Sequence, residues 1–107
     1  MTDFVVARDG TVMHGLALVY ILRDIEGMKA FKIIQESLHA TRVQVALDTP
    51  LEDALRAHIT RGVRARLGAQ VEVTVERVEA IAPEASGKFR YVVSKVDAAR
   101  NYGAGAP

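Results

Sequence analysis

The chain has 107 residues, half of them hydrophobic and a quarter charged, with a formal net charge of +1 and no cysteine. This length suits one domain with one core, and the lack of cysteine excludes disulfides, thiolate metal sites and cysteine nucleophiles. The near-neutral charge argues against a nucleic-acid or membrane surface, and residues 15–22 form an apolar stretch too short for a bilayer or signal peptide, so we expect a cytoplasmic protein.

The first residues predict a β-hairpin followed by a helix. Residues 3–8 and 11–14 are strand-like and flank an Asp-Gly pair at 9–10, both members of which can adopt positive φ in a tight turn. Apolar residues spaced on one helical face then predict a helix over 16–26, although part of this stretch is also strand-like. Gly27 suits the left-handed position after a helix.

The middle of the chain predicts two strands and a second helix. Residues 28–36 are apolar on both faces, as in an inner strand, and residues 41–48 alternate between apolar and polar. Thr49, Pro50 and Glu52 have the spacing of a capping box with proline at the first helical position. We therefore expect the second helix to begin at Pro50.

The remaining residues predict the end of that helix, two more strands and a tail. The helical stripe stops at Gly68, residues 71–76 alternate as a one-sided strand, and residues 89–96 form a last strand after a loop. The predicted fold is α+β: an N-terminal hairpin followed by α-β-β-α-β-β, with a small, mostly antiparallel sheet packed by two helices. We expect one domain over 1–97 and a flexible tail over 98–107.

Most polar residues have an ordinary structural interpretation. His14, His39 and His58 do not stand at metal-ligand spacing, so no metal site is expected. The carboxylates form no pair set for acid–base chemistry, and the arginines of the second helix are typical of a solvated helix face. Lys88 is the exception, because Ser86-Gly87 can adopt unusual backbone angles and the strand that follows would anchor the base of a projecting lysine.

These residues resemble a known superfamily. The stretch "SGKFR" (86–90), after a proline-bearing loop, resembles the last core motif of the adenylate-forming enzymes, which include the acyl-CoA synthetases. "TDFVVARDGTVMHGLAL" (2–18) resembles the hinge and hairpin that open their C-terminal domain, and residues 22–45 and 54–81 resemble the elements that follow in the phenylacetate–CoA ligase and CapK-like branch. The likeness extends over residues 2 to 96.

The resemblance implies a role for each matching residue. Lys88 would be the catalytic lysine of the adenylation step, in which a carboxylate attacks the α-phosphate of ATP, and Ser86, Gly87 and Arg90 would belong to the loop that supports it. Thr2 and Asp3 match the hinge about which this lid domain rotates. Gly10 matches the glycine of a hairpin that approaches the acceptor thiol.

The resemblance also implies partners that this sequence does not contain. The complete enzyme would use ATP with Mg²⁺ and a carboxylic acid substrate, with coenzyme A as a candidate acceptor. The chain has no phosphate-binding loop and no adenine-binding segment, so we expect it to require a large N-terminal adenylation domain, in the same parent chain or as a separate subunit. This chain alone is expected to be inactive and to bind no cofactor.

A second hypothesis comes from a different class of protein. A βαββαβ-like order also occurs in small-molecule sensor domains and in protein-interaction modules without catalysis. In that interpretation Lys88 is a solvated loop charge. Binding of a nucleotide or amino acid by the domain alone would favour the sensor, whereas a lid domain should bind almost nothing by itself.

Overall fold

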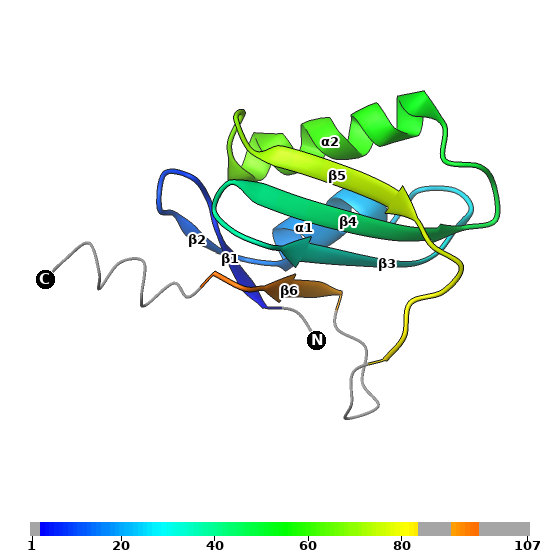
Figure 1. The fold of residues 1–107 in the computed structure, drawn as a ribbon, viewed down its shortest axis with the longest axis horizontal. Coiled ribbons are helices and arrows are strands. Elements are labelled where there is room, and N and C mark those ends of the chain that lie inside the picture. The colour runs from blue at the N-terminus through cyan, green and yellow to red at the C-terminus, as the bar shows by residue number, and fades with distance from the viewer. Residues whose placement is uncertain (1–2, 84–90, 97–107) are drawn as a thin grey trace, which may run out of the picture.

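The structure is a computed structural model that describes residues 3–83 and 91–96. Its elements are β1 (Phe4–Val6), β2 (Val12–His14), α1 (Leu16–Leu22), β3 (Met28–Gln35), β4 (Ala40–Leu47), α2 (Asp53–Leu67), β5 (Glu72–Arg77) and β6 (Val92–Ser94) (Figure 1). The predicted order of a hairpin followed by α-β-β-α-β-β is confirmed. No helix in the described part of the chain is long and apolar enough to cross a membrane.

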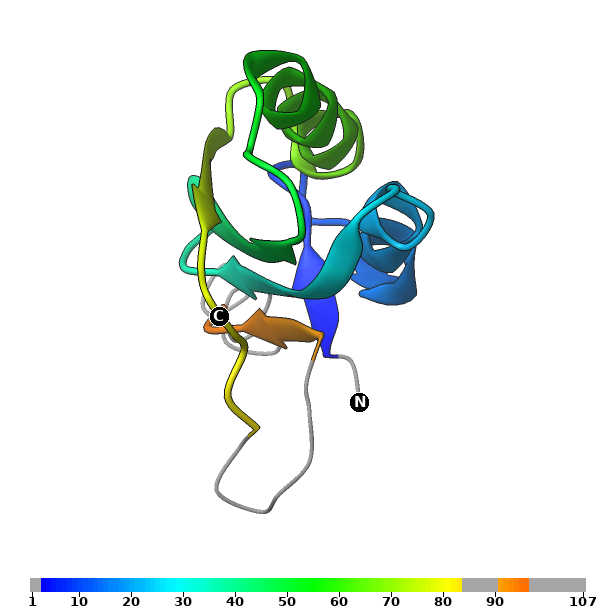
Figure 2. The same cartoon turned by 90° about the vertical axis from the view of Figure 1, so that its right-hand side faces the viewer.

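The main sheet has four strands in the order β5-β4-β3-β6, and β1 and β2 form a separate hairpin. Both helices lie on the same face of the main sheet, which gives the two-layer α+β architecture that the sequence predicts (Figure 2). The sheet is mixed rather than mostly antiparallel, because only β3 and β4 pair antiparallel, while β4 with β5 and β3 with β6 pair parallel. The β4–β5 pairing is parallel because α2 crosses between these strands and returns the chain in the same direction.

The core lies between the helices and the face of the sheet that they cover. Ile33 and Val43 on the central strands are fully buried, as are Leu18 of α1 and Ile59 of α2. The two helices approach closely at Gly62, where an added Cβ would lie 2.8 Å from Ile21 Cγ2. A larger residue at this crossing would therefore force Ile21 or the helices to shift.

The hairpin turn differs from the predicted two-residue turn. Ala7 N donates to Thr11 O at 2.8 Å and Gly10 N donates to Ala7 O at 2.9 Å, the hydrogen bonds of a longer loop that ends in a left-handed residue. Gly10 has φ 93°, and no non-glycine residue in the described ranges has positive φ, so Asp9 does not share that conformation. Instead, the Asp9 carboxylate accepts a hydrogen bond from Thr11 N, and this bond lowers the pKa of Asp9.

Both helices are shorter than predicted. α1 ends at Leu22 instead of residue 26, because the chain must turn before β3 starts at Met28. The predicted capping box is wrong: α2 begins at Asp53, and its N-cap residue Glu52 is extended and makes no side-chain cap hydrogen bond. Tertiary contacts hold the preceding segment out of the helix, since Thr49 O accepts a hydrogen bond from Arg77 Nε at 3.2 Å.

Candidate functional site

The predicted catalytic loop precedes the strand β6, which pairs with β3 at the edge of the main sheet and contacts the N-terminal strand β1. Lys88, Ser86, Gly87 and Arg90 lie outside the described residues, as does Thr2. The described chain resumes at Tyr91, three positions after Lys88. The surroundings of β6 are therefore the part of the predicted site that the structure describes.

Gln35, at the end of β3, joins β6 to the hairpin. Its side chain is buried, with 1% exposure, and its Oε1 accepts hydrogen bonds from Val6 N at 3.1 Å and from Ser94 Oγ at 2.8 Å. Its Nε2 donates to Val6 O at 2.6 Å. One amide thus satisfies both backbone groups of a β1 residue and the hydroxyl of a β6 residue, and this pattern fixes the orientation of the amide.

Asp3, a predicted hinge residue, is tied to β6 and to the start of α1. Asp3 N donates to Val92 O at 3.0 Å, and Asp3 O accepts from Gly15 N at 3.0 Å. Its carboxylate accepts from Ser94 N at 3.0 Å. These contacts fix the position at which the chain enters the domain and connect that position directly to the strand that follows Lys88.

Gly10 lies at the far end of the hairpin from Asp3. The hairpin tip contacts the end of α2, where Arg8 N donates to Leu67 O at 2.8 Å and an added Cβ at Gly68 would lie 2.9 Å from Arg8 Cγ. In Figure 1 the hairpin tip lies at the left, whereas β6 runs below β3 at the lower centre. The structure thus brings Asp3 to β6 but separates Gly10 from both.

A groove of about 450 Å³ lies beside the start of β6. It is lined by Val19, Arg23, Met28, Lys29, Ala30, Phe31, Ile81 and Tyr91. The rings of Phe31 and Tyr91 are 5.3 Å apart, and Ile81 and Tyr91 come from the two chain segments that flank residues 84–90. The groove therefore presents a mostly apolar wall, with two cationic side chains, next to the described ends of the predicted catalytic loop.

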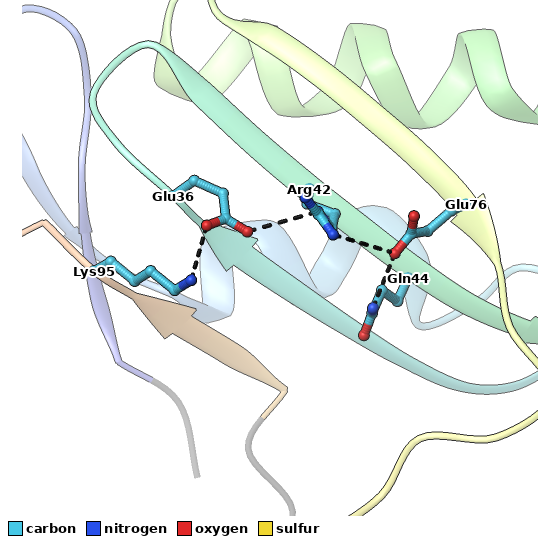
Figure 3. A network of polar contacts seen from close by, with 5 residues as sticks. All are labelled: Glu36, Arg42, Gln44, Glu76 and Lys95. Atoms are coloured by element: carbon cyan, nitrogen blue, oxygen red, sulfur yellow. Dashed lines mark hydrogen bonds and ion pairs between the residues drawn. The ribbon is translucent and has the colours of Figure 1, made fainter.

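A row of polar and charged side chains crosses the face of the main sheet that the helices do not cover, and it ends next to β6 (Figure 3). Lys95 Nζ contacts Glu36 at 2.9 Å, Arg42 lies 3.6 Å from Glu36 and 3.9 Å from Glu76, and Gln44 donates to Glu76 at 2.9 Å. The hydrogen bond from Lys95, together with the charges of Lys95 and Arg42, lowers the pKa of Glu36. We call these five residues the sheet ladder.

The histidines do not form a metal site. His14 Nδ1 accepts a hydrogen bond from Leu16 N at 3.1 Å, and its ring packs against Phe4. No group of three or more potential metal-ligating side chains occurs within residues 3–83 and 91–96.

The role of Gln35 was not predicted from the sequence, although the pattern of β3 contains a signal for it. Phe31, Ile33 and Gln35 alternate along one face of the strand, and the first two are core residues. A polar side chain on an apolar face must find partners when it is buried. That signal predicts a buried amide, but it does not identify Val6 and Ser94 as its partners.

Comparison with known proteins matches residues 5–95 to the CapK C-terminal domain family. Among solved structures, the chain is similar to the crystal structure of a domain of phenylacetate-coenzyme A ligase from Bacteroides vulgatus ATCC 8482. The TM-score is 0.57 at 19% sequence identity, over 89% of this chain and 96% of that one, which is a similarity of fold. No curated protein matches the chain.

Proposed function

The chain belongs to the CapK C-terminal domain family, and from this membership we propose that it is the C-terminal lid domain of an ATP-dependent, acyl-adenylate-forming ligase. The match over residues 5–95 carries the proposal. The fold shared with a domain of a phenylacetate-coenzyme A ligase supports it. The lid would act with a large N-terminal adenylation domain that binds ATP, Mg²⁺ and a carboxylic acid, and coenzyme A is the candidate acceptor.

Lys88 is the proposed catalytic residue of the adenylation step. When a carboxylate attacks the α-phosphate of ATP and pyrophosphate leaves, negative charge gathers on the carboxylate and phosphate oxygens. A lysine ammonium is a compact charge on a flexible stem, so it can bridge these oxygens and stabilise the transition state. Ser86, Gly87 and Arg90 would shape the loop that presents Lys88.

The anchoring of β6 supports this proposal. Val92 and Ser94 are bonded to Asp3, and Ser94 is also bonded to the buried amide of Gln35. A strand held at several points gives the loop before it a fixed base. A fixed base matters because small errors in the position of a catalytic charge reduce its effect.

The proposed hinge and acceptor hairpin rest on the same family relationship. In this conformation both the backbone and the carboxylate of Asp3 are hydrogen-bonded. Rotation of the lid would therefore either occur at the residues before Asp3 or require these bonds to break first. Gly10 is half-buried at the hairpin tip and has φ 93°, and its lack of a side chain would allow the close approach of an acceptor thiol.

The proposal predicts that Lys88→Ala, in the complete ligase, slows adenylation by about 100- to 1000-fold. This loss corresponds to about 3–4 kcal/mol of transition-state stabilisation. ATP–pyrophosphate exchange with the acid substrate measures the step. Transfer of the acyl group from a preformed adenylate to the thiol should change much less.

Lys32→Ala is the matched control, because it removes the same ammonium group from β3 instead of the predicted loop. It should leave both half-reactions near the wild-type rate. Equal losses in adenylation and thiol transfer for Lys88→Ala would contradict the assigned role. Micromolar binding of a nucleotide or amino acid by the domain alone would instead favour the sensor hypothesis.

A further inference from the structure

Large apolar side chains are exposed along one continuous strip of β1, β2 and α1. Phe4, Leu16 and Tyr20 are 59%, 44% and 54% exposed. The Phe4 and His14 rings are 5.1 Å apart in an edge-to-face arrangement, and Leu16 N donates to His14 Nδ1 at 3.1 Å. Leu16 and Tyr20 are four residues apart on α1 and so share one helix face. We call Phe4, His14, Leu16 and Tyr20 the β1–α1 strip.

The strip has the composition of an interface core. Its neighbours Val5, Leu18 and Val19 are buried, so the domain already has apolar residues facing inward on these elements. The strip adds a second apolar face that points away from the core. Arg23 closes one end with its guanidinium 4.6 Å from the Tyr20 ring centre. Aromatic residues and arginine are enriched at protein interfaces, so the composition of the strip, rather than its area, indicates a contact surface.

We propose that the β1–α1 strip is the surface by which this domain docks on its adenylation domain. This inference rests on the proposed function and deepens it by naming the contact surface. Asp3 is fixed by bonds to Val92, Ser94 and Gly15, so the N-terminal end of the described chain lies next to Phe4. An adenylation domain that precedes this domain in the same parent chain would be held next to the strip at a high effective concentration.

The size of the strip favours a tethered partner over a second copy of this chain. Its exposed side chains offer on the order of 300 Å², given that one aromatic side chain buries 150–250 Å². A stable dimer of free subunits needs about 800 Å² from each partner. A tethered domain associates without the cost of bringing two molecules together, so a smaller surface is sufficient. The expected counterpart is an apolar patch with a carboxylate facing Arg23.

Cysteine footprinting in the complete ligase tests the proposal directly. The chain contains no cysteine, so Phe4→Cys and Tyr20→Cys each introduce one reporter into this domain. Ala57→Cys, on the exposed side of α2, is the matched control. Alkylation is timed by mass spectrometry of the labelled peptides without ligands, with ATP and the acid, and with the acceptor thiol added.

We expect both strip cysteines to react at least tenfold more slowly than Ala57→Cys in one or more of these ligand states, and all three to react alike after denaturation. Reaction of the strip cysteines at the rate of Ala57→Cys in every state would overturn the proposal. Protection that disappears on dilution, together with a fall from dimer to monomer mass, would assign the strip to a second copy and also overturn it.

A functional variant gives an independent measurement. Tyr20→Asp places a charge in the middle of the strip and should lower kcat/KM of the overall ligation at least tenfold, with an unchanged unfolding midpoint. Ala57→Asp should leave kcat/KM unchanged. The lysine assignment can fail separately: normal adenylation by Lys88→Ala would refute the role of Lys88 while a protected strip still identified the docking surface.

Discussion

At the scale of single residues, the buried amide of Gln35 connects three strands of the fold, β3, β1 and β6. It supplies the hydrogen-bond partners for both backbone groups of Val6, which is buried, and for the hydroxyl of Ser94. An apolar side chain of similar size would fill the space but satisfy none of these groups. Unpaired buried donors and acceptors each cost about 1–3 kcal/mol.

We therefore predict that Gln35→Leu lowers the free energy of unfolding by about 2–4 kcal/mol. Chemical denaturation followed by circular dichroism measures the change. Gln44→Leu is the control, because Gln44 is only part-buried and bonds to Glu76 at the surface; it should cost less than about 1 kcal/mol. Equal losses in the two variants would mean that the buried amide has no special role.

At the scale of secondary-structure elements, the contact between α1 and α2 limits the side chain at position 62. An alanine there would place Cβ 2.8, 3.1 and 3.2 Å from three atoms of the Ile21 side chain. Alanine normally favours a helix over glycine by about 1 kcal/mol. The steric conflict opposes this gain, because a β-branched side chain inside a packed core moves little.

We predict that the steric cost at Ile21 exceeds the gain in helix propensity. Gly62→Ala should therefore destabilise the domain by about 1–2 kcal/mol in thermal or chemical unfolding. A double-mutant cycle tests whether contact with Ile21 causes this loss of stability. In an Ile21→Ala background the obstacle is gone, so Gly62→Ala should become neutral or stabilise by up to about 1 kcal/mol. A stabilising effect of Gly62→Ala in the wild-type background would show that the helices separate easily.

The sheet ladder links all four strands through side-chain charges and predicts a pH dependence. The folded state lowers the pKa of Glu36 below its ordinary value of 4.5, mainly through the hydrogen bond from Lys95. A carboxyl with a lowered pKa stabilises the fold above its unfolded pKa and loses that contribution as the pH falls through its folded pKa.

The stability advantage of the wild type over Glu36→Gln should therefore be present at pH 7 and shrink below about pH 4.5. Unfolding free energies measured from pH 7 to pH 3 test this expectation. Added salt should reduce the advantage at neutral pH, because these side chains are partly exposed to solvent. An advantage that grows on acidification would contradict the assignment.

At the scale of the whole molecule, local patterns in the sequence identify the elements but not all of their pairings. The alternation in 41–48 and 71–76 predicts strands, and the stripe of α2 predicts a helix, because burial on one face imposes a period on the sequence. The parallel pairing of β6 with β3 leaves no such trace. It joins residues such as Ile33 and Val92 that are far apart in the chain.

The wrong prediction for the start of α2 and the unpredicted contacts of Asp3 have related causes. The capping box at Thr49 and Glu52 is a valid local signal, but contacts of that segment with Arg77 hold it extended. The bonds between Asp3 and β6 also depend on the tertiary fold, so no local pattern could predict them. The roles of Lys88 and Gly10 remain predictions from the family relationship.

The bonds between Asp3 and Ser94 have a consequence for the order in which a cell can make this domain. Ribosomes make a protein from its N-terminus onward, so Asp3 and Gln35 are synthesised well before residues 92–94. Until that last strand emerges, one edge of β3 has no neighbour there and the buried amide lacks its hydroxyl partner. Folding of this domain can therefore be completed only after residues 92–94 have left the ribosome.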